Sequence, residues 1–107
     1  MNVLSIVSEV FPLIKTGGLA DVAGALPKAL RLQGIDVLTL VPGYSRVLRY
    51  LPNRTAVGDL DDLLGHRALI SRDEVGGLEI LVLEIPELYE REGGPYLGPD
   101  GRDHPDN

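Results

Sequence analysis

The sequence predicts an α/β fold that begins with a parallel βαβ unit and later contains a β-hairpin. The first observation is a short apolar stretch, rich in β-branched residues, at Asn2–Val7. The second is an amphipathic helical pattern that starts after Gly17 and Gly18, and the third is another apolar stretch at Ile35–Val41, ended by a Pro-Gly pair. A strand, a helix and a strand in that order form a βαβ unit, whose right-handed crossover places the two strands parallel.

The helical pattern between the two strands has a single apolar stripe. Its members are Leu19, Val22, Ala23, Leu26 and Leu30. They fall at positions i, i+3, i+4, i+7 and i+11, which lie on one face of an α-helix. Gly34 stands where a glycine commonly follows the end of a helix, and Pro27 must either kink the helix or start a second helical piece. Because neither apolar stretch alternates with polar residues, both strands are expected to be buried on two faces.

The rest of the chain shows weaker patterns. The expected elements are a short helix at Ser45–Leu51, a hairpin of His66–Ser71 and Leu78–Ile85 joined through Asp73–Gly77, and one helical turn at Pro86–Glu90. Residues 91–107 are expected to be an irregular loop, because residues 93–107 alone hold four glycines and three prolines. These elements cover one sheet face only thinly, so residues 1–107 are expected to be the N-terminal part of an incomplete domain.

Composition excludes several classes of protein. The 107 residues carry 10 Lys and Arg against 16 Asp and Glu, a formal net charge of −6, and an acidic chain is a poor partner for nucleic acids or anionic membranes. With 0 Cys there is no disulfide framework, thiolate nucleophile or cysteine metal site. Polar residues interrupt the apolar N-terminus, and no apolar run approaches the roughly 20 residues that cross a bilayer. We expect a cytoplasmic protein.

The segment Ser8–Val22 follows the first strand, and open α/β sheets bind their ligands at the carboxyl ends of strands. Gly17 and Gly18 allow backbone N–H groups to approach a ligand closely, and the start of the next helix offers further unpaired N–H groups. Lys15 adds a positive charge, so the segment predicts an anion site that suits a phosphate. The alternative is a tight turn whose glycines only allow close helix–strand packing, with Lys15 solvated.

The motif KTGGLADV at residues 15–22, preceded by Ser8-Glu9 and Phe11-Pro12, resembles the N-terminal signature of bacterial glycogen synthases and plant starch synthases. These enzymes are retaining glucosyltransferases of glycosyltransferase family 5. The likeness continues at residues 24–30, 34, 41–42 and 44, and returns at residues 88–89, 94–96 and 106–107. It spans nearly the whole chain, with a loose middle at about residues 51–79.

The resemblance implies that residues 1–107 are the N-terminal part of a starch or glycogen synthase catalytic domain. Its fold would be a partial Rossmann-like fold, the start of the N-terminal domain of a GT-B enzyme. Such an enzyme has two domains that face each other across a cleft, and it transfers glucose from ADP-glucose to the non-reducing end of an α-1,4-glucan. The C-terminal GT-B domain and the catalytic residues have no counterpart here, so we expect the 107 residues alone to transfer no glucose.

The resemblance also implies a set of substrate-binding residues. Lys15 would contact the phosphates of the donor, and the backbone of Gly17 and Gly18 would line the same pocket. Asp21 would lie toward the sugar. Further signature positions near the cleft are Glu9 and Tyr96. The fixed cation and N–H groups would stabilise the charge that builds on the departing diphosphate, so no metal and no cofactor is implied.

Two other functions fit the sequence. One is a non-enzymatic, truncated Rossmann-like module that binds a nucleotide or a partner protein, and the other is a GT-B transferase that uses another sugar nucleotide. Single residues also have alternatives: Asp21 as a helix-dipole partner, and Tyr96 as a local packing residue.

The remaining polar residues have weaker signals. His66 and His104 lack a second histidine at ligand spacing, so a zinc site is not expected. The cluster Asp59, Asp61 and Asp62 lacks the EF-hand pattern and is interpreted as a solvated turn, and Glu87, Glu90 and Glu92 are interpreted as surface residues. Arg46 and Arg49 belong either to the cleft or to an exposed helix face.

Overall fold

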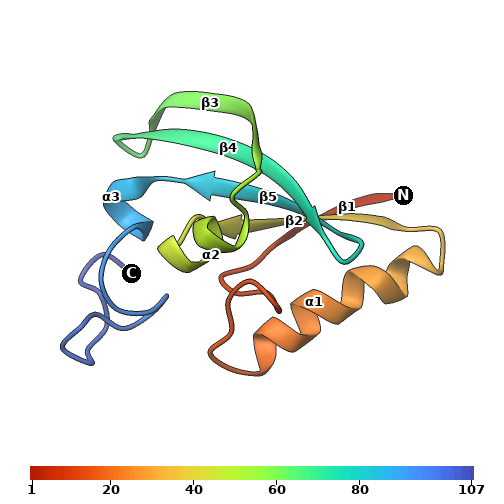
Figure 1. Ribbon diagram of the computed structural model, residues 1–107, viewed down its shortest axis with the longest axis horizontal. Helices are drawn as coiled ribbons and strands as arrows, with labels where there is room; N and C mark the ends of the chain where they lie inside the picture. Colours follow the sequence, from red (N-terminus) through yellow and green to blue (C-terminus); the bar gives the residue numbers. More distant parts are fainter.

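The computed structural model describes residues 1–107 as one curved sheet with helices packed along it (Figure 1). The elements in chain order are β1 (Asn2–Ile6), α1 (Gly18–Arg31), β2 (Asp36–Pro42), α2 (Ser45–Tyr50), β3 (Thr55–Leu63), β4 (His66–Val75), β5 (Leu78–Glu84) and α3 (Pro86–Tyr89). The five strands are ordered β1-β2-β5-β4-β3. The α/β prediction is confirmed.

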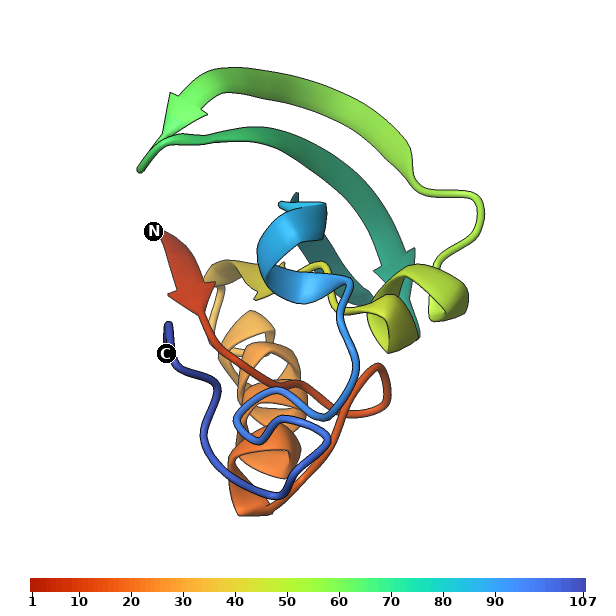
Figure 2. The same ribbon diagram turned by 90° about the vertical axis from the view of Figure 1, so that its left-hand side faces the viewer.

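The first three strands of this order are parallel. β1 pairs with β2 from Asn2 opposite Asp36 to Ile6 opposite Leu40, which confirms the predicted βαβ unit. β5 joins the other side of β2 in parallel, a neighbour that the sequence did not predict. β4 and β3 follow antiparallel, and Figure 2 shows them curving away from α1.

The predicted hairpin forms between β4 and β5, with a tighter turn than expected. β4 runs on to Val75 instead of ending at Ser71, so only Gly76 and Gly77 remain as the connection. Both glycines have positive φ angles, 54° and 82°, which two-residue hairpin turns require and residues with a Cβ rarely adopt.

Two expectations about burial are wrong. In α1 the large side chains of the predicted stripe, Leu19, Val22 and Leu26, are 48%, 60% and 50% exposed. The helix instead buries its small residues, Ala20, Ala23, Gly24 and Pro27. Small side chains let the helix approach its neighbours closely: a Cβ on Gly24 would lie 2.7 Å from the carbonyl oxygen of Phe11. Pro27 sits within one continuous helix rather than starting a second one.

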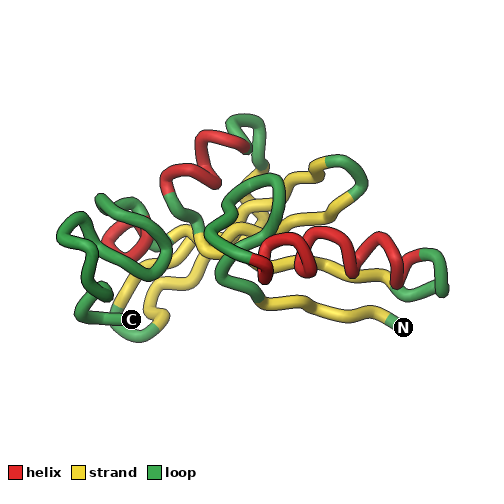
Figure 3. Tube along the Cα trace, turned by 90° about the horizontal axis from the view of Figure 1, so that it is seen from below, coloured by secondary structure: helices red, strands yellow, loops and turns green.

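The second error concerns β1, which is not buried on two faces. It is the edge strand of the sheet, and Leu4 and Ile6 are exposed. Only the face of β2 and β5 that carries Val37, Val41 and Ile80 is fully buried, because helix α1 lies along that side of the sheet. Figure 3 shows α1 running alongside the parallel strands, with the two chain ends at opposite ends of the molecule.

The acidic cluster is also placed differently from the prediction. Asp59, Asp61 and Asp62 belong to the exposed edge strand β3 rather than to a solvated turn. The Asp62 carboxylate accepts the Gly65 N–H at 2.8 Å and so stabilises the turn into β4. Residues 91–107 contain only turns and one isolated bridge between Leu97 and Asp103.

Candidate functional site

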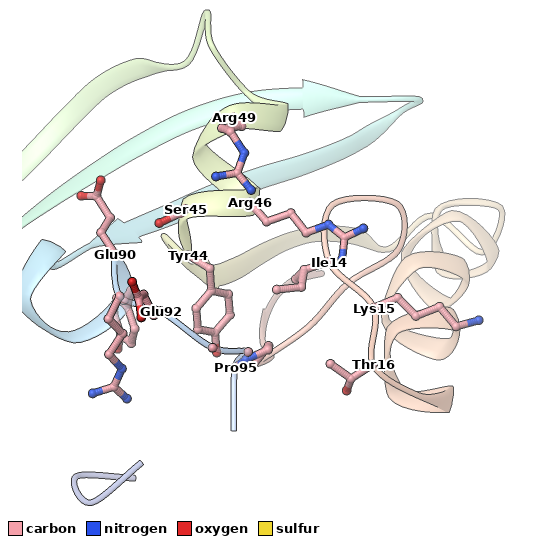
Figure 4. Close-up of a pocket in the computed structure, with 14 residues that line it drawn as sticks. Ile14, Lys15, Thr16, Tyr44, Ser45, Arg46, Arg49, Glu90, Glu92 and Pro95 are labelled. Atoms are coloured by element: carbon pink, nitrogen blue, oxygen red, sulfur yellow. The ribbon is translucent and has the colours of Figure 1, made fainter. Parts of the chain in front are cut away.

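The largest cavity lies at the carboxyl edge of the parallel strands and encloses about 640 Å³. Its walls come from the three segments that follow β1, β2 and β5: residues 14–16, residues 44–49 and residues 89–95 (Figure 4). This is the edge where open α/β sheets bind ligands, because the loops after parallel strands meet there.

The first wall is fixed by the hydrophobic core. Val10, Leu13 and Ile14 are almost fully buried in the main cluster, and Val10 and Ile14 also form a backbone bridge. The Phe11 N–H donates to the Ala20 carbonyl oxygen at 2.9 Å, which attaches this loop to α1. Lys15 and Thr16 therefore form part of the cavity wall, on a backbone that the core holds in place.

Charge in the cavity opposes the charge of the whole chain. The lining carries four basic side chains and two acidic ones, although the chain has a net charge of −6. The basic residues are Lys15, Arg46, Arg49 and Arg91, and the acidic ones are Glu90 and Glu92. A concave site with an excess of positive charge attracts anions.

Two of the four cations already have partners. The Lys15 Nζ donates to the Asp21 carboxylate at 2.7 Å, and both side chains are about half exposed. Figure 4 shows the Lys15 ammonium directed away from Tyr44 and Glu92. Arg91 donates to the Asp106 carboxylate at 2.6 Å. A ligand phosphate at Lys15 must therefore compete with Asp21. The Lys15–Asp21 ion pair is half exposed, and such exposed ion pairs are weak.

Buried Glu9 holds the KTGG loop, residues 15–18, in place through hydrogen bonds. Its side chain is 1% exposed, and its carboxylate accepts the hydroxyl groups of Thr16 and Tyr96, the latter at 2.9 Å. It also accepts the Gly17 N–H at 3.1 Å and, more weakly, the Thr16 N–H at 3.4 Å. Burial acts to raise the pKa of Glu9, but the hydrogen bonds from Thr16, Tyr96 and Gly17 outweigh it and the pKa falls below 4.5.

The two glycines of the motif differ. The Gly17 amide is directed at the buried Glu9, away from a ligand, while the first helical residue, Gly18, donates to no acceptor within the chain. A Cβ added to either glycine meets no atom within 4 Å, so close helix–strand packing does not explain why this pair is glycine.

Tyr96 connects the last loop to this network. Its hydroxyl lies 2.6 Å from the Ser8 Oγ and donates to Glu9, 87 residues earlier in the chain. It lines a smaller cavity of about 350 Å³ rather than the largest one, beside Tyr44 and Arg91. Tyr44 is one of five residues that line both cavities, and it packs edge-on against another of them, Tyr89, with ring centroids 5.7 Å apart.

Tyr44 stays protonated over the whole physiological range. Burial, aided by Tyr96, Tyr89 and Glu9, raises the pKa of Tyr44 to about 12, and Arg91 opposes this only in part. Its hydroxyl is therefore available as a hydrogen-bond donor at the boundary of the two cavities.

The structure thus brings the residues singled out from the sequence into two small networks. Lys15 pairs with Asp21, while Glu9 holds Gly17 and Tyr96. Sequence reasoning did not assign Tyr44 or Arg91 to the site and left Arg46 and Arg49 open. One feature of the sequence could have indicated Tyr44, Arg46 and Arg49. The segment PGYSRVLR follows the second strand directly and so lies at the same sheet edge as the KTGGLADV motif.

Other kinds of site are not apparent. No three His, Cys, Asp or Glu side chains are grouped as a metal site would require. His104 is buried beside the Gly94 carbonyl oxygen at 2.9 Å, and His66 lies 3.5 Å from Glu87, so each histidine has a local partner. None of the helices has the length and apolar character needed to cross a bilayer.

Three neighbouring parallel strands, a crossover helix and a cationic cavity at the carboxyl ends of these strands are typical of a Rossmann-like fold. The particular family follows from comparison with known proteins. The family model described as the starch synthase catalytic domain matches residues 2–107, and the chain belongs to this family.

Curated relatives agree with this membership. The chain is 57% identical over 107 residues to glycogen synthase 1 of Rhizobium meliloti (strain 1021) and equally identical to glycogen synthase of Methylocella silvestris. Each match covers 100% of this chain and 22% of the relative, so the chain spans about a fifth of the length of these proteins.

A solved structure agrees as well. The chain is similar to the catalytic domain of starch synthase IV from Arabidopsis thaliana bound to ADP and acarbose, with a TM-score of 0.66 and 27% sequence identity. The match covers 92% of this chain and 21% of that one. The prediction of a partial Rossmann-like, GT-B type fold is confirmed, as is the family resemblance.

Proposed function

We propose that this chain forms the N-terminal, donor-phosphate side of a glycogen or starch synthase that uses ADP-glucose. In this proposal glucose moves with retention to the non-reducing end of an α-1,4-glucan. The observation that carries it is the cationic cavity at the carboxyl edge, with Lys15 in its wall. The relatives named glycogen synthase and the starch synthase IV structure with ADP and acarbose support the choice of substrates.

The geometry suggests how the motif would act. The donor diphosphate would draw the Lys15 ammonium away from Asp21, which is favourable because the diphosphate of a sugar nucleotide carries two negative charges and the carboxylate one. Asp21 would then be free to accept a hydroxyl of the sugar. The Gly18 N–H at the start of α1 would add a backbone donor. These donors would stabilise the charge that develops on the leaving diphosphate more than that of the ground state.

Glu9 and Tyr96 have a supporting part in this proposal. Glu9 is buried and occupied by four hydrogen bonds, so it sets the position of the Lys15–Gly18 backbone from beneath rather than meeting substrate directly. Tyr96 reaches Glu9 with its hydroxyl while its ring lines the smaller cavity, where a sugar ring could stack on it. No cofactor is part of the proposal, and the cytoplasmic location stays a prediction.

The rest of the enzyme would come from sequence that these 107 residues do not include. The relatives are more than four times longer, so a C-terminal GT-B domain and the acceptor glucan would complete the cleft. We expect the 107 residues alone to transfer no glucose.

The test uses a chimera in which these residues replace the matching part of the 57% identical glycogen synthase. Lys15→Ala should lower kcat/KM for ADP-glucose. The corresponding loss of transition-state stabilisation should be roughly 1.5–3 kcal/mol, the range of hydrogen bonds to charged groups. The matched control is Lys28→Ala in the last turn of α1, outside the cavity. An unchanged kcat/KM in the Lys15 variant would remove this residue from donor binding.

Two outcomes of the same assay would favour the other functions. A folded chimera that does not elongate glucan would favour a non-enzymatic nucleotide-binding or interaction module. A preference for UDP-glucose over ADP-glucose in competition would favour a GT-B transferase with another sugar nucleotide.

A further inference from the structure

We propose that Arg46 and Arg49 form a second anion subsite in the largest cavity, which binds a phosphate monoester of a carbohydrate. This inference rests on the geometry of α2 and not on the role proposed for Lys15. Both arginines belong to the six-residue helix α2 and both line the cavity, together with Ser45. Residues three apart on a helix share a face, and Figure 4 shows both side chains at the cavity, with the Arg49 guanidinium near Ser45 and the Arg46 side chain extending toward Ile14.

The two arginines differ from the other cations of the cavity in having no partner. Lys15 is paired with Asp21 and Arg91 with Asp106, at 2.7 Å and 2.6 Å. The ion pairs of the chain include neither Arg46 nor Arg49, although carboxylates outnumber cations in the sequence. Two neighbouring like charges on one helix repel each other, and an anion bound between them relieves that repulsion.

The backbone that carries this pair is held in place from the other side. Val47 and Leu51 are fully buried, and Arg54 donates to the Leu51 carbonyl oxygen at 3.1 Å, just after α2. Arg54 also forms a bidentate pair with the Glu84 carboxylate at the end of β5, at 3.0 Å and 3.1 Å. Burial acts to raise the pKa of Glu84, but the hydrogen bonds from Arg54 and Ser71 lower this pKa overall, so the ion pair stays charged.

This anchoring makes α2 a rigid base for two long side chains. Buried apolar residues and a bidentate ion pair fix its backbone, so only side-chain freedom is lost when an anion binds. An anchored base of this kind favours binding more than an exposed, mobile arginine pair does.

The chemistry of the walls indicates the ligand. Guanidinium groups match the oxygens of a phosphate in a bidentate way, and the Ser45 hydroxyl adds a neutral donor. Glu90 and Glu92 line the same cavity and oppose a ligand with negative charge throughout. Carboxylates accept hydrogen bonds from hydroxyl groups, so a single phosphate on a hydroxyl-rich body fits both kinds of wall.

The experiment titrates the 107-residue chain with inorganic phosphate and with glucose 1-phosphate, followed by NMR shifts and calorimetry. The double variant R46Q/R49Q should bind both probes at least ten-fold more weakly. The charge-matched control R67Q/R102Q removes two exposed arginines outside the cavity and should stay within two-fold of wild type. Circular dichroism checks that each variant is folded, which we expect because Arg46 and Arg49 are exposed.

The outcomes separate this subsite from the proposed function. Loss in R46Q/R49Q with little change in K15Q supports it, whatever the donor assay gives for Lys15. Retained phosphate affinity in R46Q/R49Q, or no saturable phosphate binding by wild type, overturns it. If glucose 1-phosphate binds no more tightly than phosphate, the carbohydrate part of the proposal is wrong.

Discussion

Replacement of Glu9 tests the buried network on which the loop geometry depends. In Glu9→Ala, the N–H groups of Thr16 and Gly17 lose their acceptor, and the hydroxyls of Thr16 and Tyr96 lose theirs. The hydroxyls lie on exposed residues and can turn to water, but the Gly17 N–H is directed into the buried carboxylate. Loss of the carboxylate acceptor of this part-buried hydrogen bond costs about 1–3 kcal/mol, and truncation of the buried Glu9 side chain also leaves a cavity.

The expected loss for Glu9→Ala is therefore about 3 kcal/mol in the free energy of unfolding, a large share of the stability of a domain this size. Glu9→Gln should lose less, about 1–2 kcal/mol, because its oxygen can still accept the backbone N–H groups while its amide donates to the two hydroxyls. Urea denaturation with a constant m-value measures both.

The control is Glu92→Ala, which removes an exposed carboxylate that has no hydrogen bond within the chain. It should change the free energy of unfolding by no more than about 0.5 kcal/mol. If Glu9→Ala costs as little as Glu92→Ala, the carboxylate does not hold the loop and the reasoning is refuted.

Three further predictions concern stability. Thr39→Val should raise the free energy of unfolding by about 1 kcal/mol, because the Thr39 hydroxyl is buried without a partner; a lower Tm would contradict this. Gly24→Ala should lower it by about 1–2 kcal/mol, since the Cβ would press on the Phe11 carbonyl oxygen, whereas open space at Gly18 makes Gly18→Ala a harmless control in the same melt. Because its pKa is lowered on folding, Glu9 stabilises the fold above pH 4.5 and loses this as pH falls further, so acid titration of Glu9→Gln should show a shallower decline than wild type.

The sequence predicted the local elements better than their surroundings. The βαβ start, the later hairpin and both short helices are present because apolar runs, glycine turns and Pro86 act locally. β3 was missed because TAVGDLDDL is acidic and contains a glycine, and an exposed edge strand needs no apolar face. Which face of α1 is buried depends on the closeness of the Phe11 loop, and this long-range contact leaves no periodic signal.

For the candidate site, too, the sequence predicts what is determined locally and misses what depends on long-range contacts. The position of Lys15 at the carboxyl edge follows from the order of strand, glycine turn and helix. Its pairing with Asp21 and the engagement of Gly17 by Glu9 are side-chain choices that spacing alone does not determine. The contribution of Arg91 could not be predicted, because it depends on β5 lying next to β2 and so bringing the segment after it to the same edge.

The bond between Glu9 and Tyr96 joins residues 87 positions apart, and this has a consequence for biosynthesis. On the ribosome, Glu9 emerges long before Tyr96, whose hydroxyl donates to it, so the network beneath the loop is complete only after residue 96 has been made. A contact of such sequence separation also carries a large loop-closure entropy cost. A chain that ends before Tyr96 would hold the buried Glu9 carboxylate with one hydrogen-bond donor fewer, which would make its N-terminal loop less stable.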